Sequence, residues 1–308
     1  MSRVYEALQK SQGETTSVSP LVSGPEEAAP SEATAVAVAG GVPIGTPTDA
    51  NWLNVPADRT LHPAPTPEQR LVALAAPDSP GAEMFRVLST RLAHMQNKRR
   101  LQKLLVTSSV GDEGKSVIAV NLALTLARRP SARTLLIEAD LRRPSAGQLL
   151  TTASLRGISD WDEGKLALQD SLYRVNDLPL WFLSAGHSIE DPLPLLESDR
   201  FAKMLETISS SFDWVVLDAT PMLPMADSTS LARLCDGVLV VVREGFTHRK
   251  VLNKALESIE RNKLLGMVFN EASMLNVGYE RYYANNNSSG KSKKERKKEA
   301  DKVTAATA

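Results

Sequence analysis

The feature that most restricts the fold of this chain is a series of short apolar runs with almost no polar residue inside them. They alternate with longer stretches in which apolar residues recur at helical spacing. Strands that lack polar alternation are buried on both faces, as in a parallel sheet covered by helices on both sides. We therefore expect an α/β fold with a doubly wound, mostly parallel sheet. The expected strands are residues 103–109, 134–140, 180–185, 213–219, 236–244 and 264–270, and the expected helices are residues 82–95, 114–129, 193–212, 227–234 and 247–262.

Length and composition agree with one large globular domain or two modest ones. Lys and Arg number 36, as do Asp and Glu, so the chain of 308 residues has no basic excess that would favour nucleic acid as a partner. The single cysteine, Cys235, excludes an internal disulfide, and no Cys/His cluster suits zinc. No apolar run approaches the roughly 18 residues of a membrane span, and the N-terminus lacks the apolar core of a signal peptide. These features predict a cytoplasmic protein.

The two ends of the chain differ in composition from the middle. Residues 11–80 hold 11 of the 18 prolines and one aromatic residue, Trp52. Such a stretch buries too little apolar surface to offset its ordering entropy, so we expect a disordered arm between a short helix at 1–10 and a folded domain at 81–284. Residues 285–308 carry seven Lys or Arg and three acids, which predicts a disordered basic tail. The first helix is either a docking peptide or a frayed end, and the tail either touches anionic lipid or is simply solvated.

The segment TSSVGDEGKSVIAVNLA, residues 107–123, joins an expected strand to an expected helix. Glycines let backbone amides converge on phosphate oxygens, and a helix N-terminus adds positive dipole. A lysine at that place reaches the outer phosphates of a nucleotide, and the next hydroxyl can bind magnesium. The usual pattern has a glycine at position 109, where this chain has a serine. The alternative is a glycine-rich turn with a surface lysine. The residues expected to bind nucleotide here are Gly111, Asp112, Glu113, Gly114, Lys115, Ser116 and Val117.

Charged residues end two of the other expected strands. Glu138, Asp140 and Arg142 close one of them, and Asp218 closes another. In open α/β sheets the ligand lies outside the carboxyl ends of the strands, so these residues are expected to face the same crevice as the phosphates. Ser116 and Asp218 would then hold a magnesium ion, directly or through water. For each acid alone, a helix cap or a solvated strand end is the alternative.

The span from about residue 83 to residue 283 resembles the bacterial tyrosine kinases of capsule and exopolysaccharide synthesis, a family of P-loop proteins. The matching features are the GDEGKS loop, the segments LLIEADLRRP, DWVVLDATP and CDGVLVVVREGFT, and a C-terminus that carries tyrosines. The resemblance implies ATP and Mg²⁺ as cofactors. It implies that Lys115 and Ser116 bind phosphate and magnesium, and that Asp140 and Asp218 complete the metal site.

The resemblance also assigns roles to residues outside the loop. The family usually has Asp at position 138, where it is thought to help activate the attacking tyrosine; this chain has Glu138, one methylene longer. Arg142 is expected at the nucleotide. Asn270 resembles a residue that contacts adenine in related folds, and the alternative is an amide that caps the strand end.

Asp227, by contrast, is interpreted from its position alone: it comes directly before the helical segment STSLARL and fits an N-cap.

Self-association is a further implication of the resemblance. The family transfers phosphate between subunits to a tyrosine cluster, here Tyr279, Tyr282 and Tyr283. Aromatic anchoring of the chain end is the alternative. The family also seats subunits in a ring through Glu, Arg and Arg at successive third positions, and this chain has Glu83 and Arg86 followed by a serine at position 89.

The sequence therefore predicts an ATP- and Mg²⁺-dependent protein-tyrosine autokinase that acts in trans on its C-terminal tyrosines. A separate membrane chain-length regulator would activate it and hold it beside the inner membrane. One alternative is a positioning ATPase of the MinD and ParA group, which carries a signature lysine where this chain has Val110. The other alternative is a nucleotide-binding scaffold of the polysaccharide machinery. It stays open because this chain has Glu138 where the family usually has Asp.

Overall fold

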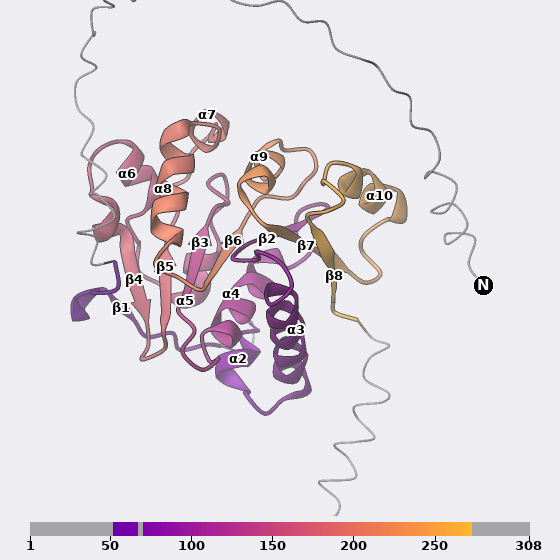
Figure 1. Cartoon of the computed structure of the whole chain (residues 1–308), viewed down its shortest axis with the longest axis horizontal. Helices are drawn as coiled ribbons and strands as arrows, with labels where there is room; N and C mark the ends of the chain where they lie inside the picture. The colour runs from indigo at the N-terminus through magenta and orange to yellow at the C-terminus, as the bar shows by residue number, and fades with distance from the viewer. Residues whose placement is uncertain (1–51, 67–69, 273–308) are drawn as a thin grey trace, which may run out of the picture. The chain divides into compact units, whose positions relative to one another are not determined.

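The computed structural model describes residues 52–66 and 70–272, and its centre is one mixed sheet (Figure 1). The strands lie in the order β1-β4-β5-β3-β6-β2-β7-β8. Every neighbouring pair in the described residues is parallel except β4 and β5, which are antiparallel. The strands are β1 (Thr60–Leu61), β2 (Lys103–Ser108), β3 (Thr134–Glu138), β4 (Leu172–Val175), β5 (Leu180–Leu183), β6 (Trp214–Asp218), β7 (Gly237–Arg243) and β8 (Leu264–Asn270).

Helices cover both faces of the sheet, as Figure 1 shows. One face packs against α6, α8, α9 and α10, and the other against α2, α3, α4 and α5. Within the described residues, no helix is both long and apolar enough to cross a membrane. The helices are α2 (Val72–Ala75), α3 (Pro80–Gln96), α4 (Lys115–Leu126), α5 (Ala146–Leu150), α6 (Ile158–Asp162), α7 (Leu193–Leu196), α8 (Asp199–Ser209), α9 (Asp227–Leu234) and α10 (Arg249–Glu257), with short 3₁₀ turns at Ala57–Arg59 and Leu168–Ser171.

The apolar pattern of the central strands explains why the sheet is covered on both sides. In β6, Val215 and Leu217 enter one core and Val216 enters the other, and all three are fully buried. The predicted doubly wound α/β fold is confirmed, and the six predicted strands agree with β2, β3, β5, β6, β7 and β8 to within two residues at each end. The helix expected at 193–212 is divided, because the Ser198 side chain accepts a hydrogen bond from the Phe201 amide and starts α8.

The structure differs from expectation between residues 52 and 80, which we expected to belong to the disordered arm. Trp52, Leu61 and Leu71 are buried in the two cores, and β1 pairs with β4 at the edge of the sheet. The average composition of this stretch is poor in apolar residues, but its few large ones are placed where each meets an existing core. A short segment needs only those anchors and a few backbone hydrogen bonds to dock, and average composition does not report them.

Candidate functional site

The turn between β2 and α4 is built around Gly114, the N-cap of α4. Its φ of +87° lies in the left-handed region that favours glycine. The preceding Glu113 is fully buried, and its carboxylate accepts hydrogen bonds from the Val110 amide at 2.9 Å and from the Thr247 hydroxyl. The side chain of Glu113 therefore stabilises the loop from inside, and its neighbours Gly111 and Asp112 are exposed. Amides of this turn and of the first turn of α4 are the groups that could bind phosphate.

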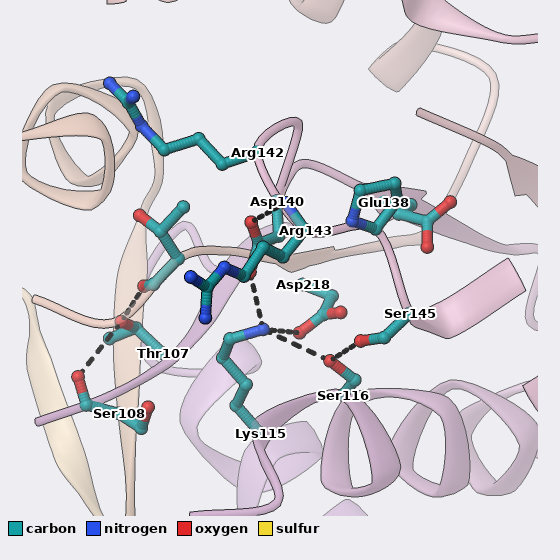
Figure 2. A network of polar contacts seen from close by, with 12 residues as sticks. Thr107, Ser108, Lys115, Ser116, Glu138, Asp140, Arg142, Arg143, Ser145 and Asp218 are labelled. Carbon is teal, nitrogen blue, oxygen red and sulfur yellow. Dashed lines mark hydrogen bonds and ion pairs between the residues drawn. The ribbon is translucent and has the colours of Figure 1, made fainter. Parts of the chain in front are cut away.

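The first residue of α4, Lys115, lies between acids from two strands (Figure 2). Its Nζ is 2.7 Å from Asp140 Oδ2 and 3.9 Å from Asp218 Oδ1, and it donates to Ser116 Oγ at 3.2 Å. Burial lowers the pKa of Lys115, but the charges of Asp218 and Asp140 outweigh burial, and the pKa is raised. Lys115 is therefore a fixed positive charge at the mouth of α4.

Asp218 ends β6 and is fully buried. Neither of its carboxylate oxygens has a hydrogen-bond partner among the described residues. Burial raises the pKa of Asp218 to about 6, and the charge of Lys115 opposes that rise. A buried carboxylate without hydrogen bonds is unfavourable unless a cation or another partner completes it.

The donor set around Asp218 suits magnesium. Ser116 and Asp140 add a hydroxyl and a second carboxylate next to the same lysine. The described part of the chain has no group of three or more His, Cys, Asp or Glu placed to hold a metal ion. Magnesium is usually bound through one or two carboxylates together with waters and phosphates, so this small oxygen set fits it.

The loop after β3 adds two residues that the sequence analysis did not single out, Arg143 and Ser145. Asp140 Oδ1 accepts a hydrogen bond from the Arg143 amide at 3.0 Å, and Ser145 Oγ donates to Ser116 Oγ at 2.8 Å. Lys115, Asp140 and Arg143 line a cavity of about 430 Å³. The segment after β6 also lines this cavity and contributes the apolar residues Pro221, Leu223, Pro224 and Met225.

Glu138 is placed differently from what we expected. It is buried, and its carboxylate accepts hydrogen bonds from the Gly147 amide at 3.0 Å, the Ala185 amide at 3.1 Å and the Ser184 hydroxyl at 3.2 Å. Figure 2 shows the carboxylate pointing away from Lys115. This arrangement ties β3 to α5 and to the end of β5, and it does not present Glu138 to a phenol in the Lys115 cavity.

Arg142 pairs with an acid that we had interpreted as a helix cap. Its Nε lies 2.6 Å from Asp227 Oδ2, and it also contacts Asp191 and the Glu190 carbonyl. The N-cap of α9 is Ala226, so the prediction for Asp227 is wrong: Asp227 is the first helical residue and is fully buried. A buried carboxylate requires a partner, and Arg142 supplies it. The pair ties the loop after β3 to α9.

Asn270, at the end of β8, contacts the P-loop directly. Its Nδ2 donates to the Glu113 carbonyl at 2.9 Å, and its Oδ1 accepts from the Glu271 amide at 3.0 Å. Both ends of the amide are thus used by the backbone, in agreement with the capping alternative. Val117, the remaining loop residue of the prediction, lies in the first turn of α4 and is partly exposed. The tyrosines expected to accept phosphate, Tyr279, Tyr282 and Tyr283, lie outside the described residues.

On α3, Glu83 and Arg86 form an i,i+3 ion pair at 2.5 Å. Ser89, one turn further on, is buried, and its hydroxyl lies 3.5 Å from Arg129 Nη1. An arginine that follows α4 therefore approaches the position where the family has a second arginine on the helix. The spacing along α3 gave no sign of this neighbour.

A buried strand, a glycine turn and a helix that begins Lys-Ser, facing acids from two further strand ends, define a P-loop protein. No protein-family model matches the chain. It is 30% identical over 194 residues to the tyrosine-protein kinase CpsD of Streptococcus agalactiae serotype Ia, covering 62% of this chain and 82% of that protein. It is 27% identical over 205 residues to the tyrosine-protein kinase YwqD of Bacillus subtilis, and the match covers 66% of this chain and 86% of YwqD. The succinoglycan biosynthesis transport protein ExoP of Rhizobium meliloti is 32% identical over 219 residues, covering 69% and 28%.

Solved structures agree with these relatives. The chimerical protein CapA2B2 has a TM-score of 0.63 and 26% identity, covering 69% of this chain and 93% of that one. The kinase domain of the Escherichia coli tyrosine kinase ETK has a TM-score of 0.60 and 26% identity, covering 66% and 82%. The chain belongs to the bacterial tyrosine-protein kinases of capsule and exopolysaccharide synthesis, and the resemblance drawn from the sequence is confirmed.

Proposed function

We propose that this chain transfers the terminal phosphoryl group of ATP, with Mg²⁺, to tyrosines of a second copy of itself. The observation that supports the proposal most directly is the unsatisfied, buried carboxylate of Asp218, 3.9 Å from Lys115 Nζ. A cation site beside a fixed ammonium group, at the mouth of a helix, suits a metal-bound triphosphate.

Each group of the site has a separate task in this proposal. Amides of the turn at residues 111–116 and the Lys115 ammonium group bind the outer phosphates. Ser116, Asp140 and Asp218 hold the metal, directly or through water. When bound, magnesium neutralises charge on the phosphate oxygens. Because Lys115 is already held by two carboxylates, its position is set before the nucleotide arrives, which favours catalysis by preorganised charge.

The apolar wall of the cavity supports an aromatic acceptor. Leu223 and Met225 would pack against a phenol ring brought in by another copy, while its hydroxyl faces the phosphate. The proposed acceptors are Tyr279, Tyr282 and Tyr283. Tyr173 is a poorer acceptor, because its hydroxyl accepts a hydrogen bond from the Arg156 amide within the fold.

The relatives suggest where the activity operates. One of them is named a succinoglycan biosynthesis transport protein, and others are tyrosine-protein kinases named Cps or Cap. We extend this to the present chain as regulation of polysaccharide synthesis or export from the cytoplasmic side of the membrane. A membrane chain-length regulator would act as activator, and the neighbouring gene is the first place to look for it.

Incubation of the purified full chain with Mg²⁺ and ATP tests the activity. Phosphotyrosine should appear, and it should be lost in Lys115→Met, which removes the ammonium group at the phosphates. Lys203→Met is a matched control, because Lys203 is an exposed residue of α8. Phosphotyrosine that persists in Lys115→Met would overturn the proposal, as would ATP hydrolysis and ATP-dependent dimers without any phosphotyrosine.

A mixing experiment tests transfer between copies. One chain carries Lys115→Met and intact tyrosines, and the other is active, carries a size tag, and has Phe in place of Tyr279, Tyr282 and Tyr283. Transfer in trans should place phosphate on the inactive, untagged chain. Phosphate found only on the tagged active chain would show that other tyrosines accept it and that the three C-terminal tyrosines of the inactive copy are not used in trans.

A further inference from the structure

Two adjacent arginines in the loop after β3 have different surroundings. Arg142 is paired with Asp227 at 2.6 Å and with Asp191 at 3.3 Å, so its charge is used within the fold. The Arg143 guanidinium group forms no ion pair with any residue that the structure describes, and the residue is exposed. Both arginines line the same cavity as Lys115. Figure 2 shows the Arg143 side chain extending past Asp140 toward the end of β2, whereas the Arg142 side chain points away from Lys115.

The backbone that carries Arg143 is held at three places. The Arg143 amide donates to Asp140 Oδ1, Ser145 Oγ donates to Ser116, and Arg142 is bound to α9 through Asp227. The base of the side chain is therefore fixed, while its end is free to meet a ligand. A guanidinium group placed in this way can form paired hydrogen bonds with phosphate oxygens.

With a triphosphate bound, the negative charges in the cavity would exceed the positive charge that Lys115 and one metal ion supply. Lys115 faces two carboxylates, Asp140 and Asp218, and the exposed Asp112 also belongs to the cavity wall. A triphosphate adds several more negative charges, of which one metal ion and one ammonium group neutralise only a part. Arg143 is the residue of this cavity whose positive charge has no partner in the described fold.

The position of Arg143 indicates which phosphate it meets. Lys115 is the first residue of α4, and Figure 2 shows the Arg143 side chain beyond the Lys115 ammonium group, away from the start of α4. The Arg143 amide is bonded to Asp140, which is the ion-pair partner of Lys115. The inner phosphates are bound by the amides in this type of loop, so the terminal phosphate is the one that faces Arg143.

We infer that Arg143 binds the terminal phosphate of the nucleotide and thereby distinguishes a triphosphate from a diphosphate. Arg142, the arginine expected there from the sequence, is instead a positioning residue that holds the loop through Asp227. This inference rests on the nucleotide site of the proposed function, and it adds a specificity-determining residue to that site.

Calorimetric titration of the full chain with ATP and with ADP, each with Mg²⁺, tests the inference without relying on catalysis. Arg143→Ala should weaken ATP binding by about tenfold or more, as expected for a lost charge-assisted hydrogen bond, and should leave ADP binding within about twofold. Arg143→Lys should recover part of the loss. Arg128→Ala is a matched control, because Arg128 is also exposed and has no ion pair within the described residues. The melting temperature of Arg143→Ala should equal that of the unmodified protein.

The outcomes separate this inference from the proposed function. Equal weakening of ATP and ADP in Arg143→Ala, or no weakening of ATP, would overturn the role of Arg143 even in an active kinase. Selective weakening of ATP in a protein that never forms phosphotyrosine would support Arg143 and reject the kinase. If the unmodified protein binds neither ATP nor ADP, the role of Arg143 and the proposed kinase function are both overturned.

Discussion

The side chain of Asn270 lies against Gly114 so closely that a β-carbon at position 114 would be 2.2 Å from Asn270 Nδ2. A real β-carbon is essentially never so close to another atom, so a side chain at position 114 would require the Asn270 side chain to move away from the turn. The left-handed φ of +87° independently favours glycine at this position. Asn270 also donates a hydrogen bond to the carbonyl of Glu113, 157 positions earlier in the chain, so the end of β8 supports the conformation of this turn.

Gly114→Ala should destabilise the protein by about 1–3 kcal/mol and weaken nucleotide binding, because the alanine strains the backbone and displaces the amide. Asn270→Ala alone should cost about 1 kcal/mol through the lost hydrogen bond. In the double variant the clash is absent and only the backbone strain remains. The destabilisation of the double variant should therefore be smaller than the sum of the losses measured for the two single variants. Urea unfolding of the unmodified protein, the two single variants and the double variant gives this double-mutant cycle. Strictly additive costs would contradict the contact.

Arg142→Ala should destabilise the protein by about 3 kcal/mol, because it leaves the fully buried Asp227 carboxylate without its ion-pair partner. The combined change Arg142→Met and Asp227→Leu removes both charges and should be closer in stability to the unmodified protein. Arg156→Ala, which breaks a more exposed i,i+4 pair with Asp160, should cost less than about 0.5 kcal/mol. Equal losses in Arg142→Ala and Arg156→Ala would show that burial of Asp227 carries no penalty.

The central strands could be predicted because their signal is local: a run such as Val215–Leu217 is apolar at every position, which only a strand covered on both faces requires. The turn between β2 and α4 could be predicted for the same reason, since its glycines, lysine and serine lie close together in the sequence.

Partners far apart in the sequence were not predictable in the same way. Arg142 and Asp227 are 85 residues apart, and nothing in either segment indicates which acid an arginine will meet. An aspartate at the start of a helix fits an N-cap, but Asp227 is instead the first helical residue, and its carboxylate is the partner of Arg142. The direction in which Glu138 points depends on amides from α5 and the end of β5, which the sequence of β3 does not contain.

Trp52→Ala should lower the melting temperature by several degrees. Trp52 is 3% exposed and belongs to the same core as Trp181 and Phe212, and truncation of such a side chain costs about 3–5 kcal/mol. Thermal unfolding of the full chain measures the effect. Asn54→Ala, an exposed neighbour, is the control and should change little. An unchanged melting temperature in Trp52→Ala would mean that residues before α3 do not contribute to the core.

The buried Asp218 carboxylate should lower the free energy of unfolding as the pH rises, and bound magnesium should offset this loss. Its pKa is raised from the ordinary value of 3.8 to about 6 by burial, so between these values the folded protein binds more protons than the unfolded chain. The contribution of this group to stability is therefore present at low pH and decreases as the pH rises from about 4 through about 6. Denaturant midpoints measured across this window, without nucleotide or metal, should show the decrease.

Asp218→Asn should remove this dependence, and at pH 7.5 the variant without ligands should be at least as stable as the unmodified protein, because burial disfavours the ionised form of the Asp218 carboxylate. Magnesium with ATP should stabilise the unmodified protein above about pH 6, where Asp218 is ionised, and much less at pH 5, and it should not stabilise Asp218→Asn through the metal at any pH. Asp58→Asn, a change at an exposed acid, should keep both the pH profile and the response to magnesium. Identical profiles for Asp218→Asn and the unmodified protein would show that Asp218 neither titrates in this range nor holds the metal.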